Sequence, residues 1–331
     1  MSSVTMGDVT MRAITQVGYG GPDVLRLAEV PRPTPGPGRV LVRVRAAGVD
    51  RGTWHLMAGR PYAVRAVLGL RRPRNTATGL DVAGTVAALG PGVSGFAVGD
   101  AVFGTAHGSF AEYVVARADR IAPKPDRLGF EEAAVVAVSG LTALQGLREA
   151  GRVRAGQRVL VTGASGGVGT YAVQLAKAFG AEVTGLCGPA KADLVRSLGA
   201  DHVVDYTCED VTAGGRRFDL VLDLAGSTPV ARLRRVLEPR GTLVVAGGED
   251  DGDWLGLGRQ FRALVRSPFT RQRLTMLLSR QGRAGLDDLA GLIEAGSVTP
   301  VVGSVFPLER VPEALTLLTD GGARGKIAIT V

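Results

Sequence analysis

A glycine-rich turn is the part of this sequence whose residue types and spacing are best suited to chemistry. The turn is Thr162-Gly163-Ala164-Ser165-Gly166-Gly167-Val168-Gly169, and it lies between an apolar run over 158–162 and a helix-forming run over 167–179. Glycines let the backbone approach a pyrophosphate closely, and a helix start offers free N–H groups and the positive end of a dipole. The sequence therefore predicts that residues 164–169 bind the phosphates of a dinucleotide.

The end of the next predicted strand, 182–186, bears on which dinucleotide is bound. An Asp or Glu at this point binds the ribose 2′-hydroxyl of NADH. Here the strand is followed by Cys187, no acid occurs before Asp193, and Lys191 lies nearby. A carboxylate would repel a 2′-phosphate, whereas a lysine attracts it. We therefore expect Cys187 and Lys191 to lie at the cofactor and the cofactor to be NADPH, although Lys191 is also what an ordinary surface helix start would carry.

Polar side chains in residues 50–62 are candidates for assisting a hydride transfer. Reduction of a quinone or an α,β-unsaturated carbonyl leaves an oxygen that needs only a hydrogen bond or a proton. Candidates in this segment are Asp50, His55 and Tyr62. His55 titrates near neutral pH, but packing explains it more simply. Tyr62 fits a half-buried packing role as well as a catalytic one.

Two different patterns of elements must position these residues. Residues 11–135 contain short strands and turns, such as the alternating run 40–45, and their glycines suit a curled sheet. From about 136, strands at 158–162, 182–186, 202–205, 218–223 and 241–246 alternate with helices at 167–179 and 190–198. This alternation predicts an α/β fold with a doubly wound parallel sheet.

The two ends of the chain complete the predicted organisation. Residues 1–10 are expected to be a disordered extension, with the first strand beginning at Met11. The segment 301–331 has a strand–helix–strand pattern and is expected to return to the first domain. The predicted domains are therefore 11–137 with 286–331, and 138–285. The arginine-rich segment 259–283 predicts either two amphipathic helices broken at Pro268 or a lid over a substrate entrance.

Composition excludes several classes of protein. The 331 residues carry a net charge of +8, but the arginines are spread along the chain and only 5% of residues are aromatic. No nucleic-acid platform is therefore expected, and the charge suits an anionic small molecule. Cys187 and Cys208 are the only cysteines, which suits a reducing cytoplasm. No apolar run approaches the ~18–20 residues of a membrane span.

A series of short motifs resembles the medium-chain dehydrogenase/reductase superfamily, in its zinc-independent quinone oxidoreductase-like branch. Short-chain dehydrogenases share a similar glycine turn, but it lies near their N-terminus, and no tyrosine here has a lysine four residues later. The stretch Ser267-Pro268-Phe269 is similar to a subgroup that includes the reticulon-interacting oxidoreductases. The motifs, in the order of the superfamily, are Gly48-Val49-Asp50, Gly79-Leu80-Asp81-Val82-Ala83-Gly84, Gly99-Asp100-Ala101-Val102, Gly108-Ser109-Phe110-Ala111-Glu112-Tyr113, Gly140-Leu141-Thr142-Ala143, Ala164-Ser165-Gly166-Gly167-Val168-Gly169, Leu198-Gly199-Ala200-Asp201 and Gly325-Lys326.

This resemblance implies a Rossmann domain for NADPH, a GroES-like, partly open β-barrel catalytic domain, and a homodimer. It places Asp50 near the nicotinamide and Tyr62, at a spacing one residue different, near the substrate. It also implies further cofactor contacts at Thr142, Tyr206, Ala225, Gly226, Ala246, Gly247, Gly325 and Lys326.

The resemblance also bears on metal binding. Zinc-dependent relatives need a Cys, a His with an acidic neighbour, and a third thiolate or carboxylate. At the matching positions this chain has Asp50, Leu80-Asp81 and Gly140, and neither leucine nor glycine ligates through its side chain. We therefore expect no metal.

The expected function is NADPH-dependent reduction of a small molecule, either a quinone or an α,β-unsaturated carbonyl. The sequence leaves two alternatives open, an enoyl-thioester or biosynthetic double-bond reductase, and a regulatory protein that binds NADPH without turnover.

Overall fold

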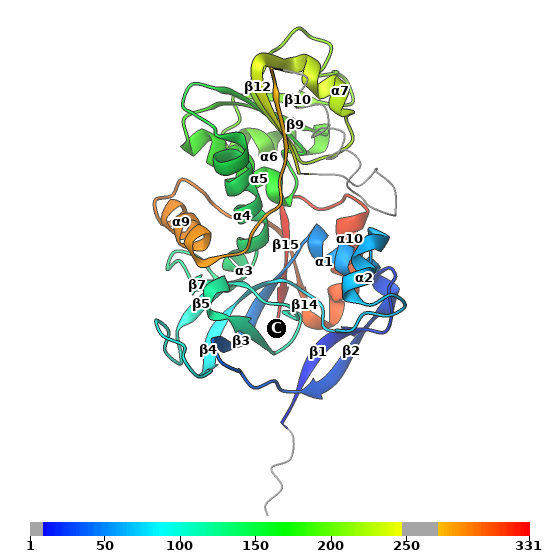
Figure 1. Ribbon diagram of the computed structural model, residues 1–331, viewed down its shortest axis with the longest axis vertical. Helices are drawn as coiled ribbons and strands as arrows, with labels where there is room; N and C mark the ends of the chain where they lie inside the picture. Colours follow the sequence, from blue (N-terminus) through cyan, green and yellow to red (C-terminus); the bar gives the residue numbers. More distant parts are fainter. Residues whose placement is uncertain (1–8, 247–270) are drawn as a thin grey trace, which may run out of the picture.

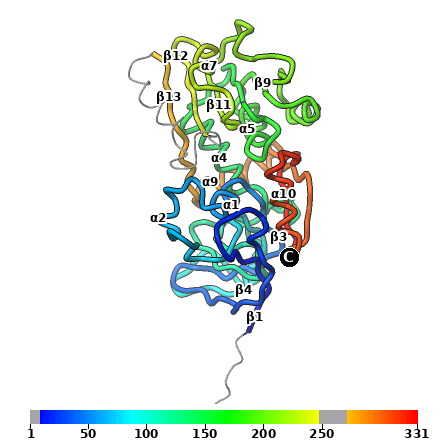
Figure 2. The backbone as a smooth tube through the Cα atoms, turned by 90° about the vertical axis from the view of Figure 1, so that its right-hand side faces the viewer, coloured from blue at the N-terminus to red at the C-terminus, as the bar shows by residue number. Residues whose placement is uncertain are grey.

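Two lobes stacked along the long axis make up the molecule (Figure 1). The computed structural model describes residues 9–246 and 271–331. The upper lobe in Figure 1 is built on a six-stranded parallel sheet and is called the parallel-sheet lobe; the lower is called the mixed-sheet lobe. Figure 2 shows the same two lobes from the side, with α4 and α9 near their junction.

The parallel-sheet lobe has the strand order β10-β9-β8-β11-β12-β13. This order reverses beside β8, so the loops after β8 and β11 diverge at the carboxyl edge of the sheet, where ligands of doubly wound folds bind. The strands are β8 (Arg158–Thr162), β9 (Glu182–Cys187), β10 (His202–Asp205), β11 (Phe218–Asp223), β12 (Leu237–Val245) and β13 (Arg273–Met276). The helices are α4 (Ala137–Gln145), α5 (Gly167–Ala178), α6 (Ala192–Ser197), α7 (Val230–Leu233) and α9 (Arg283–Glu294).

The mixed-sheet lobe contains a curved sheet with the order β14-β15-β3-β4-β5-β7, and β6 also pairs with β3. A separate hairpin joins β1 to β2. The strands are β1 (Thr10–Gln16), β2 (Leu25–Pro31), β3 (Arg39–Val49), β4 (Asp81–Leu89), β5 (Ala101–Thr105), β6 (Tyr113–Arg117), β7 (Ile121–Pro123), β14 (Val302–Pro307) and β15 (Lys326–Thr330). The helices are α1 (Arg51–Ala58), α2 (Arg65–Leu68), α3 (Phe130–Ala133) and α10 (Val311–Thr319).

The predicted fold class is confirmed in both lobes. The curved sheet of the mixed-sheet lobe is partly open, because β14 and β7 at its two ends do not pair with each other in the described residues. The last strand, β15, inserts between β14 and β3. Chain from both ends of the sequence therefore builds this sheet. The predicted domain limits at 137, 138 and 286 stay a prediction.

Two details differ from the sequence expectations. Thr10 already belongs to β1 and pairs with Pro31 of β2, so the strand begins before Met11; residues 1–8 of the expected extension lie outside the described residues. In the arginine-rich segment, Arg273–Met276 is a strand rather than a helix, because it pairs in parallel with β12 at the sheet edge. Residues 259–270 of that segment also lie outside the described residues.

A continuous apolar core joins the lobes. One buried cluster includes Phe103 of β5, Leu144 of α4, Leu175 of α5 and Leu289 of α9, all less than 1% exposed. Because packed interiors resist sliding, this shared core fixes the start of α5 relative to the mixed-sheet lobe.

Candidate active site

The glycine turn after β8 leads directly into α5. Gly166 is the N-cap and no side chain caps the helix. Thr170 makes the first intrahelical bond, to the carbonyl of Gly166. The N–H groups of Gly167, Val168 and Gly169 have no hydrogen-bond partner among the described residues, as is usual for a first helical turn. These donors, with the helix dipole, suit the phosphates of a dinucleotide.

Close backbone packing explains why this turn needs glycine. Gly163 has φ +66°, a left-handed conformation that glycine adopts without strain. A Cβ on Gly169 would lie 2.1 Å from the carbonyl oxygen of Gly163, so the helix can approach the turn only without a side chain there. The residues present therefore fit a dinucleotide.

The loop after β11 is tied to the same turn. The hydroxyl of Thr162 donates to Asp223 Oδ1 at 2.8 Å and accepts the N–H groups of Leu224 and Ala225. Gly226 donates its N–H to Asp223. The structure thus brings the predicted residues Ala225 and Gly226 beside the glycine turn. At the end of β12, Ala246 donates its N–H to the carbonyl of Asp223, and Gly247 lies outside the described residues.

Three predicted cofactor residues gather at the end of β9. Cys187 is buried, burial raises the pKa of its thiol, and its carbonyl accepts the N–H of Tyr206. Tyr206 is 63% exposed and its hydroxyl lies against Gly188. Lys191 Nζ donates to the carbonyls of Gly321 and Ala323 at 2.9 and 2.6 Å.

A second cation lies beside Lys191. Burial, followed by the charge of Arg324, lowers the pKa of Lys191. Sequence reasoning did not single out Arg324, although it directly precedes the predicted Gly325-Lys326 pair. The end of β9 therefore presents two cations where the NADH-specific pattern requires an acid.

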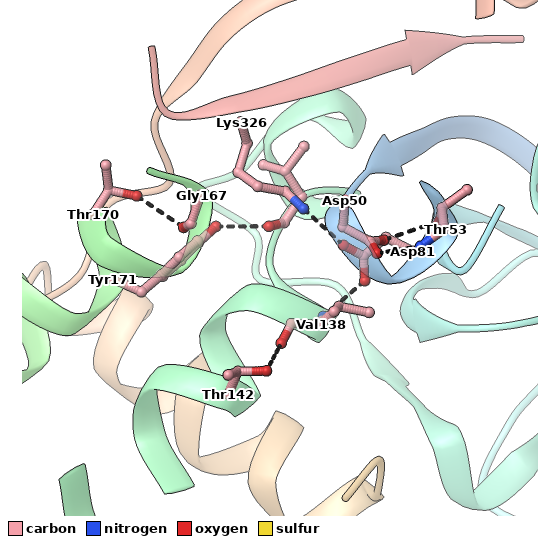
Figure 3. A network of polar contacts seen from close by, with 10 residues as sticks. Asp50, Thr53, Asp81, Val138, Thr142, Gly167, Thr170, Tyr171 and Lys326 are labelled. Carbon is pink, nitrogen blue, oxygen red and sulfur yellow. Dashed lines mark hydrogen bonds and ion pairs between the residues drawn. The ribbon is translucent and has the colours of Figure 1, made fainter. Parts of the chain in front are cut away.

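The C-terminal segment connects the glycine turn to a buried charge cluster. Gly325 donates its N–H to the carbonyl of Ser165 at 3.3 Å. The stem of Lys326 passes next to Gly167, where an added Cβ would lie 2.9 Å from Lys326 Cδ. Its ammonium, however, lies 3.3 Å from Asp81 Oδ2 (Figure 3). Lys326 therefore reaches past the turn toward the mixed-sheet lobe.

Asp81, at the start of β4, is the centre of this charge cluster. It is 0% exposed, and Lys326 is 2% exposed. The other carboxylate oxygen, Oδ1, accepts the N–H of Val138 in the first turn of α4 at 2.7 Å. Burial raises the pKa of Asp81 to about 7; Asp50 adds to this rise, while Lys326 and the Val138 N–H oppose it.

Asp50 lies beside Asp81 and caps α1. Gly48 pairs with Asp81 across β3 and β4, which places Asp50 close to Asp81 (Figure 3). Asp50 Oδ1 accepts the N–H of Thr53 at 2.8 Å, and Oδ2 accepts its hydroxyl at 3.2 Å. Asp50 is 6% exposed, so this carboxylate is part of the buried cluster.

Tyr62 and Thr142 are the other two residues predicted to lie near the substrate or the nicotinamide. Tyr62 lies in a short helical turn, with the guanidinium groups of Arg60 and Arg65 at 5.8 and 4.6 Å from its ring centre. Thr142 donates its hydroxyl to the carbonyl of Val138, one turn earlier in α4. The Thr142 hydroxyl is thus bonded within its own helix, and the roles of Tyr62 and Thr142 stay predictions.

A small cavity opens beside Thr53. Apolar side chains of α1 and α2 form one wall, and Asn75 and His107 form part of another. The amide of Asn75 lies 3.3 Å from the His107 ring. The cavity volume of about 40 Å³ leaves room for a few atoms rather than for a whole ring, so it suits the oxygen end of a carbonyl compound. Sequence reasoning missed this role for Thr53 and Asp81; the Asp-x-x-Thr spacing of a helix cap was the available signal for Thr53.

Two further properties concern metal ligands and membrane spans in residues 9–246 and 271–331. No group of three or more His, Cys, Asp or Glu side chains is placed there to hold a metal ion. Within the same ranges, every helix is too short or too polar to cross a bilayer.

Comparison with known proteins gives consistent matches. A family model described as an alcohol dehydrogenase GroES-like domain matches residues 36–126, and one described as a zinc-binding dehydrogenase matches residues 198–329. The chain is 33% identical over 338 residues to a chloroplast envelope quinone oxidoreductase homolog of Arabidopsis thaliana, covering 98% of this chain and 99% of that protein.

Two further matches extend this likeness. The chain is 32% identical over 351 residues to the mitochondrial NAD(P)H oxidoreductase RTN4IP1 of Bos taurus, covering 95% of this chain and 87% of that protein. The structure of the quinone oxidoreductase from Coxiella burnetii superposes with a TM-score of 0.87 at 29% identity, covering 98% of this chain and 100% of the other.

Proposed function

This chain belongs to the medium-chain dehydrogenase/reductase superfamily, in its zinc-independent quinone oxidoreductase-like branch, and from that premise we propose that it transfers a hydride from NADPH to a quinone or an α,β-unsaturated carbonyl. It is an oxidoreductase of the quinone oxidoreductase type. NADPH, when bound, supplies the hydride. The residues described above bind the nucleotide and handle the proton.

One observation carries the proposal: the open first turn of α5 is joined by the C-terminal segment to a buried acid cluster. The free N–H groups of Gly167, Val168 and Gly169 suit a pyrophosphate. Gly325 contacts this turn through Ser165, and Lys326 extends from it to Asp81 at 3.3 Å. A nucleotide held at the turn would therefore lie close to groups that handle protons.

The charges at the end of β9 support NADPH over NADH. Lys191 and Arg324 lie there together, and Lys191 is held by two main-chain carbonyls rather than by a carboxylate. A 2′-phosphate would satisfy both cations, whereas an unphosphorylated ribose would leave them without a counter-charge.

The acceptor is proposed from the chemistry of the side chains at the centre. Where zinc-dependent relatives need thiolate and imidazole ligands, the matching positions hold Asp50, Leu80 and Gly140. An electron-poor quinone or enone accepts hydride with only a hydrogen bond or a proton at its oxygen. Thr53, bonded to Asp50 and facing the cavity, is suited to that task.

A substrate panel tests the proposal. Quinones, enones and enoyl thioesters are each incubated with the protein and NADPH, and NADPH consumption is followed by absorbance. We expect turnover with quinones or enones. Turnover restricted to enoyl thioesters would replace the acceptor class, and tight NADPH binding without any turnover would contradict an enzymatic function.

The oligomeric state of the protein and its location in the cell stay predictions. A homodimer joined through edge strands of the parallel sheet would use β10 or β13, which are the outer strands of that sheet in the part of the chain that the structure describes, and light scattering would measure it. A cytoplasmic location is likewise a prediction, which fractionation of cells that contain the protein would check.

A further inference from the structure

Reduction of a quinone or an enone consumes a proton as well as a hydride, so the site needs a proton donor. Tyr62 was the sequence candidate, but its ring lies against Arg60 and Arg65. The groups that lie together at the junction of the lobes are instead Asp81, Lys326, Asp50 and Thr53 (Figure 3).

The charges of this cluster are not balanced. Two carboxyl groups, Asp50 and Asp81, face one ammonium, Lys326, and all three are at least nine-tenths buried. Uncompensated charge in a buried site is costly, so such a cluster tends to take up a proton. A proton bound there would leave the three groups together neutral.

Thr53 is the connection between the cluster and the cavity. Its hydroxyl lies 3.2 Å from Asp50 Oδ2, and the residue lines the cavity together with Leu56 and Met57. With Asp50 ionised, the hydroxyl donates to the carboxylate. With Asp50 protonated, the hydrogen bond reverses, and the Thr53 hydroxyl is free to donate into the cavity.

We propose that Asp50, Asp81 and Lys326 form a buried proton store, and that Thr53 is the catalytic residue that delivers its proton to the substrate oxygen. This proposal rests on the proposed function. Asp50 passes the proton to Thr53, and Asp81 and Lys326 are positioning residues that keep the proton within the cluster.

The atoms and electrons of the step balance. The hydride pair bonds to the electron-poor carbon of the acceptor, and the displaced π electrons move onto the carbonyl oxygen. That oxygen takes the hydroxyl proton of Thr53, which regains one from the acid cluster through Asp50, the member to which it is hydrogen-bonded. The store is refilled by a proton from water after the product leaves, so one hydride and one proton are consumed in each turnover.

Four groups from different parts of the fold bear on this store. Lys326 comes from β15, Asp50 from the residue before α1, and the Val138 N–H from α4. Tyr171 comes from α5; burial and the Asp81 charge raise its phenol pKa well above the usual value, and it donates to the carbonyl of Val135. Tyr171 therefore stays neutral, and the pKa of Asp81, about 7, is consistent with a store that fills near neutral pH.

The nucleotide-free protein provides a test that does not depend on turnover. Carboxyl ¹³C NMR of aspartate-labelled protein should show one resonance that titrates near neutral pH and disappears in Asp81→Asn. The matched control is Asp201→Asn, which removes the carboxylate of a surface pair with Lys177 at 2.8 Å and should leave that resonance in place. A wild-type protein in which every aspartate titrates in the ordinary acidic range would overturn the proton store.

Variants of Thr53 test the delivery step. Thr53→Val keeps the shape but removes the hydroxyl, and it should lower kcat by about 10- to 100-fold with an unchanged KM for NADPH. The solvent deuterium isotope effect should rise, whereas Thr53→Ser should restore the rate. Thr184→Val, a buried threonine of β9, is the control expected to behave as wild type. Full turnover by Thr53→Val would contradict the role of Thr53.

The pH dependence of kcat distinguishes a role of Asp81 in positioning the proton from a role in packing alone. In the wild type, kcat should fall as the pH rises above about 7, because the store is then empty; in Asp81→Asn this fall should be lost. A profile shared by both proteins would overturn the role of Asp81. If no acceptor in the panel is reduced, the NMR titration still tests the proton store by itself. If an acceptor is reduced but no aspartate titrates near neutral pH, the proposed function stands and the proton store is ruled out.

Discussion

The turn before α5 and the charge cluster beside it lie next to each other but are built in opposite ways. The turn presents main-chain N–H groups of consecutive residues, whereas the cluster combines side chains of Asp50, Asp81 and Lys326 from three separate places in the chain. A main-chain site tolerates changes of side chain but not an added Cβ at its tight points. A side-chain cluster is instead sensitive to changes of side chain, because its function depends on the charges of those groups. The comparison therefore predicts different sensitivities for two neighbouring sites.

The strongest test of this comparison is Gly169→Ala, the smallest side-chain addition in the turn. The new Cβ would lie 2.1 Å from the Gly163 carbonyl oxygen, and relief of such overpacking costs about 1–3 kcal/mol. Because the N–H groups must move as well, NADPH affinity should fall at least about tenfold, measured by fluorescence titration.

A matched glycine of α9 serves as its control. Gly291→Ala meets nothing within 4 Å and should leave NADPH affinity unchanged and stability equal or slightly higher. Equal affinities in Gly169→Ala and Gly291→Ala would show that the turn is not a main-chain site.

Lys191→Ala sharpens the comparison, because it removes a side chain at the end of β9, the far end of the proposed nucleotide site. A charged hydrogen bond is worth about 1.5–3 kcal/mol, so the Kd for NADPH should rise about tenfold or more while the Kd for NADH stays unchanged. Titrations with both nucleotides measure this. Parallel losses for NADPH and NADH would mean that Lys191 acts only by holding the loop of Gly321 and Ala323.

The smallest expected effect concerns stability and pH. Burial raises the pKa of Asp81 to about 7, above the value of about 3.9 in an unfolded chain. The folded protein therefore holds this proton more tightly, and the contribution of Asp81 to the free energy of unfolding falls as the pH rises from about 4 to about 7. Unfolding temperatures measured across this range should decline more steeply in the wild type than in Asp81→Asn.

The pKa of Asp201 is lowered, whereas that of Asp81 is raised, so its effect on stability has the opposite dependence on pH. Burial opposes the shift, but Lys177 and the N–H of Val183 lower the pKa of Asp201. Its stabilising contribution is therefore present above the ordinary pKa and is lost as the pH falls through the lowered one. Asp201→Asn should change the unfolding temperature only on the acid side, and a change of slope like that of Asp81→Asn would show that the slope does not report on the cluster.

The glycine turn can be located from the sequence alone, but only part of the side-chain cluster can. Residues 164–169 are contiguous and flanked by a strand and a helix, so local patterns contain the information. The Asp81–Lys326 contact joins residues 245 positions apart, and a pairing of that range follows only from the insertion of β15 beside β3. Lys326 was predicted as a cofactor residue by resemblance, yet its ammonium lies at Asp81.

Short segments explain the error in the arginine-rich region. Arg273-Leu274-Thr275-Met276 is too brief for its apolar spacing to distinguish a helix from a strand. Pairing with Thr242–Val245 of β12 decides the outcome, because an exposed sheet edge offers a full set of main-chain partners. The predicted helix at 273–276 was therefore wrong for a reason that local sequence does not contain.

The position of β15 has a consequence for how the protein is made. Lys326 leaves the ribosome 245 residues after Asp81, so during much of synthesis the buried side of Asp81 has no ammonium to face. The strands from β8 to β13 are complete much earlier, and folding of early segments during translation is common. The strands of the parallel-sheet lobe are thus complete while the chain is still growing, whereas the mixed-sheet lobe obtains β15 and the charge partner of Asp81 only after all of those strands have been made.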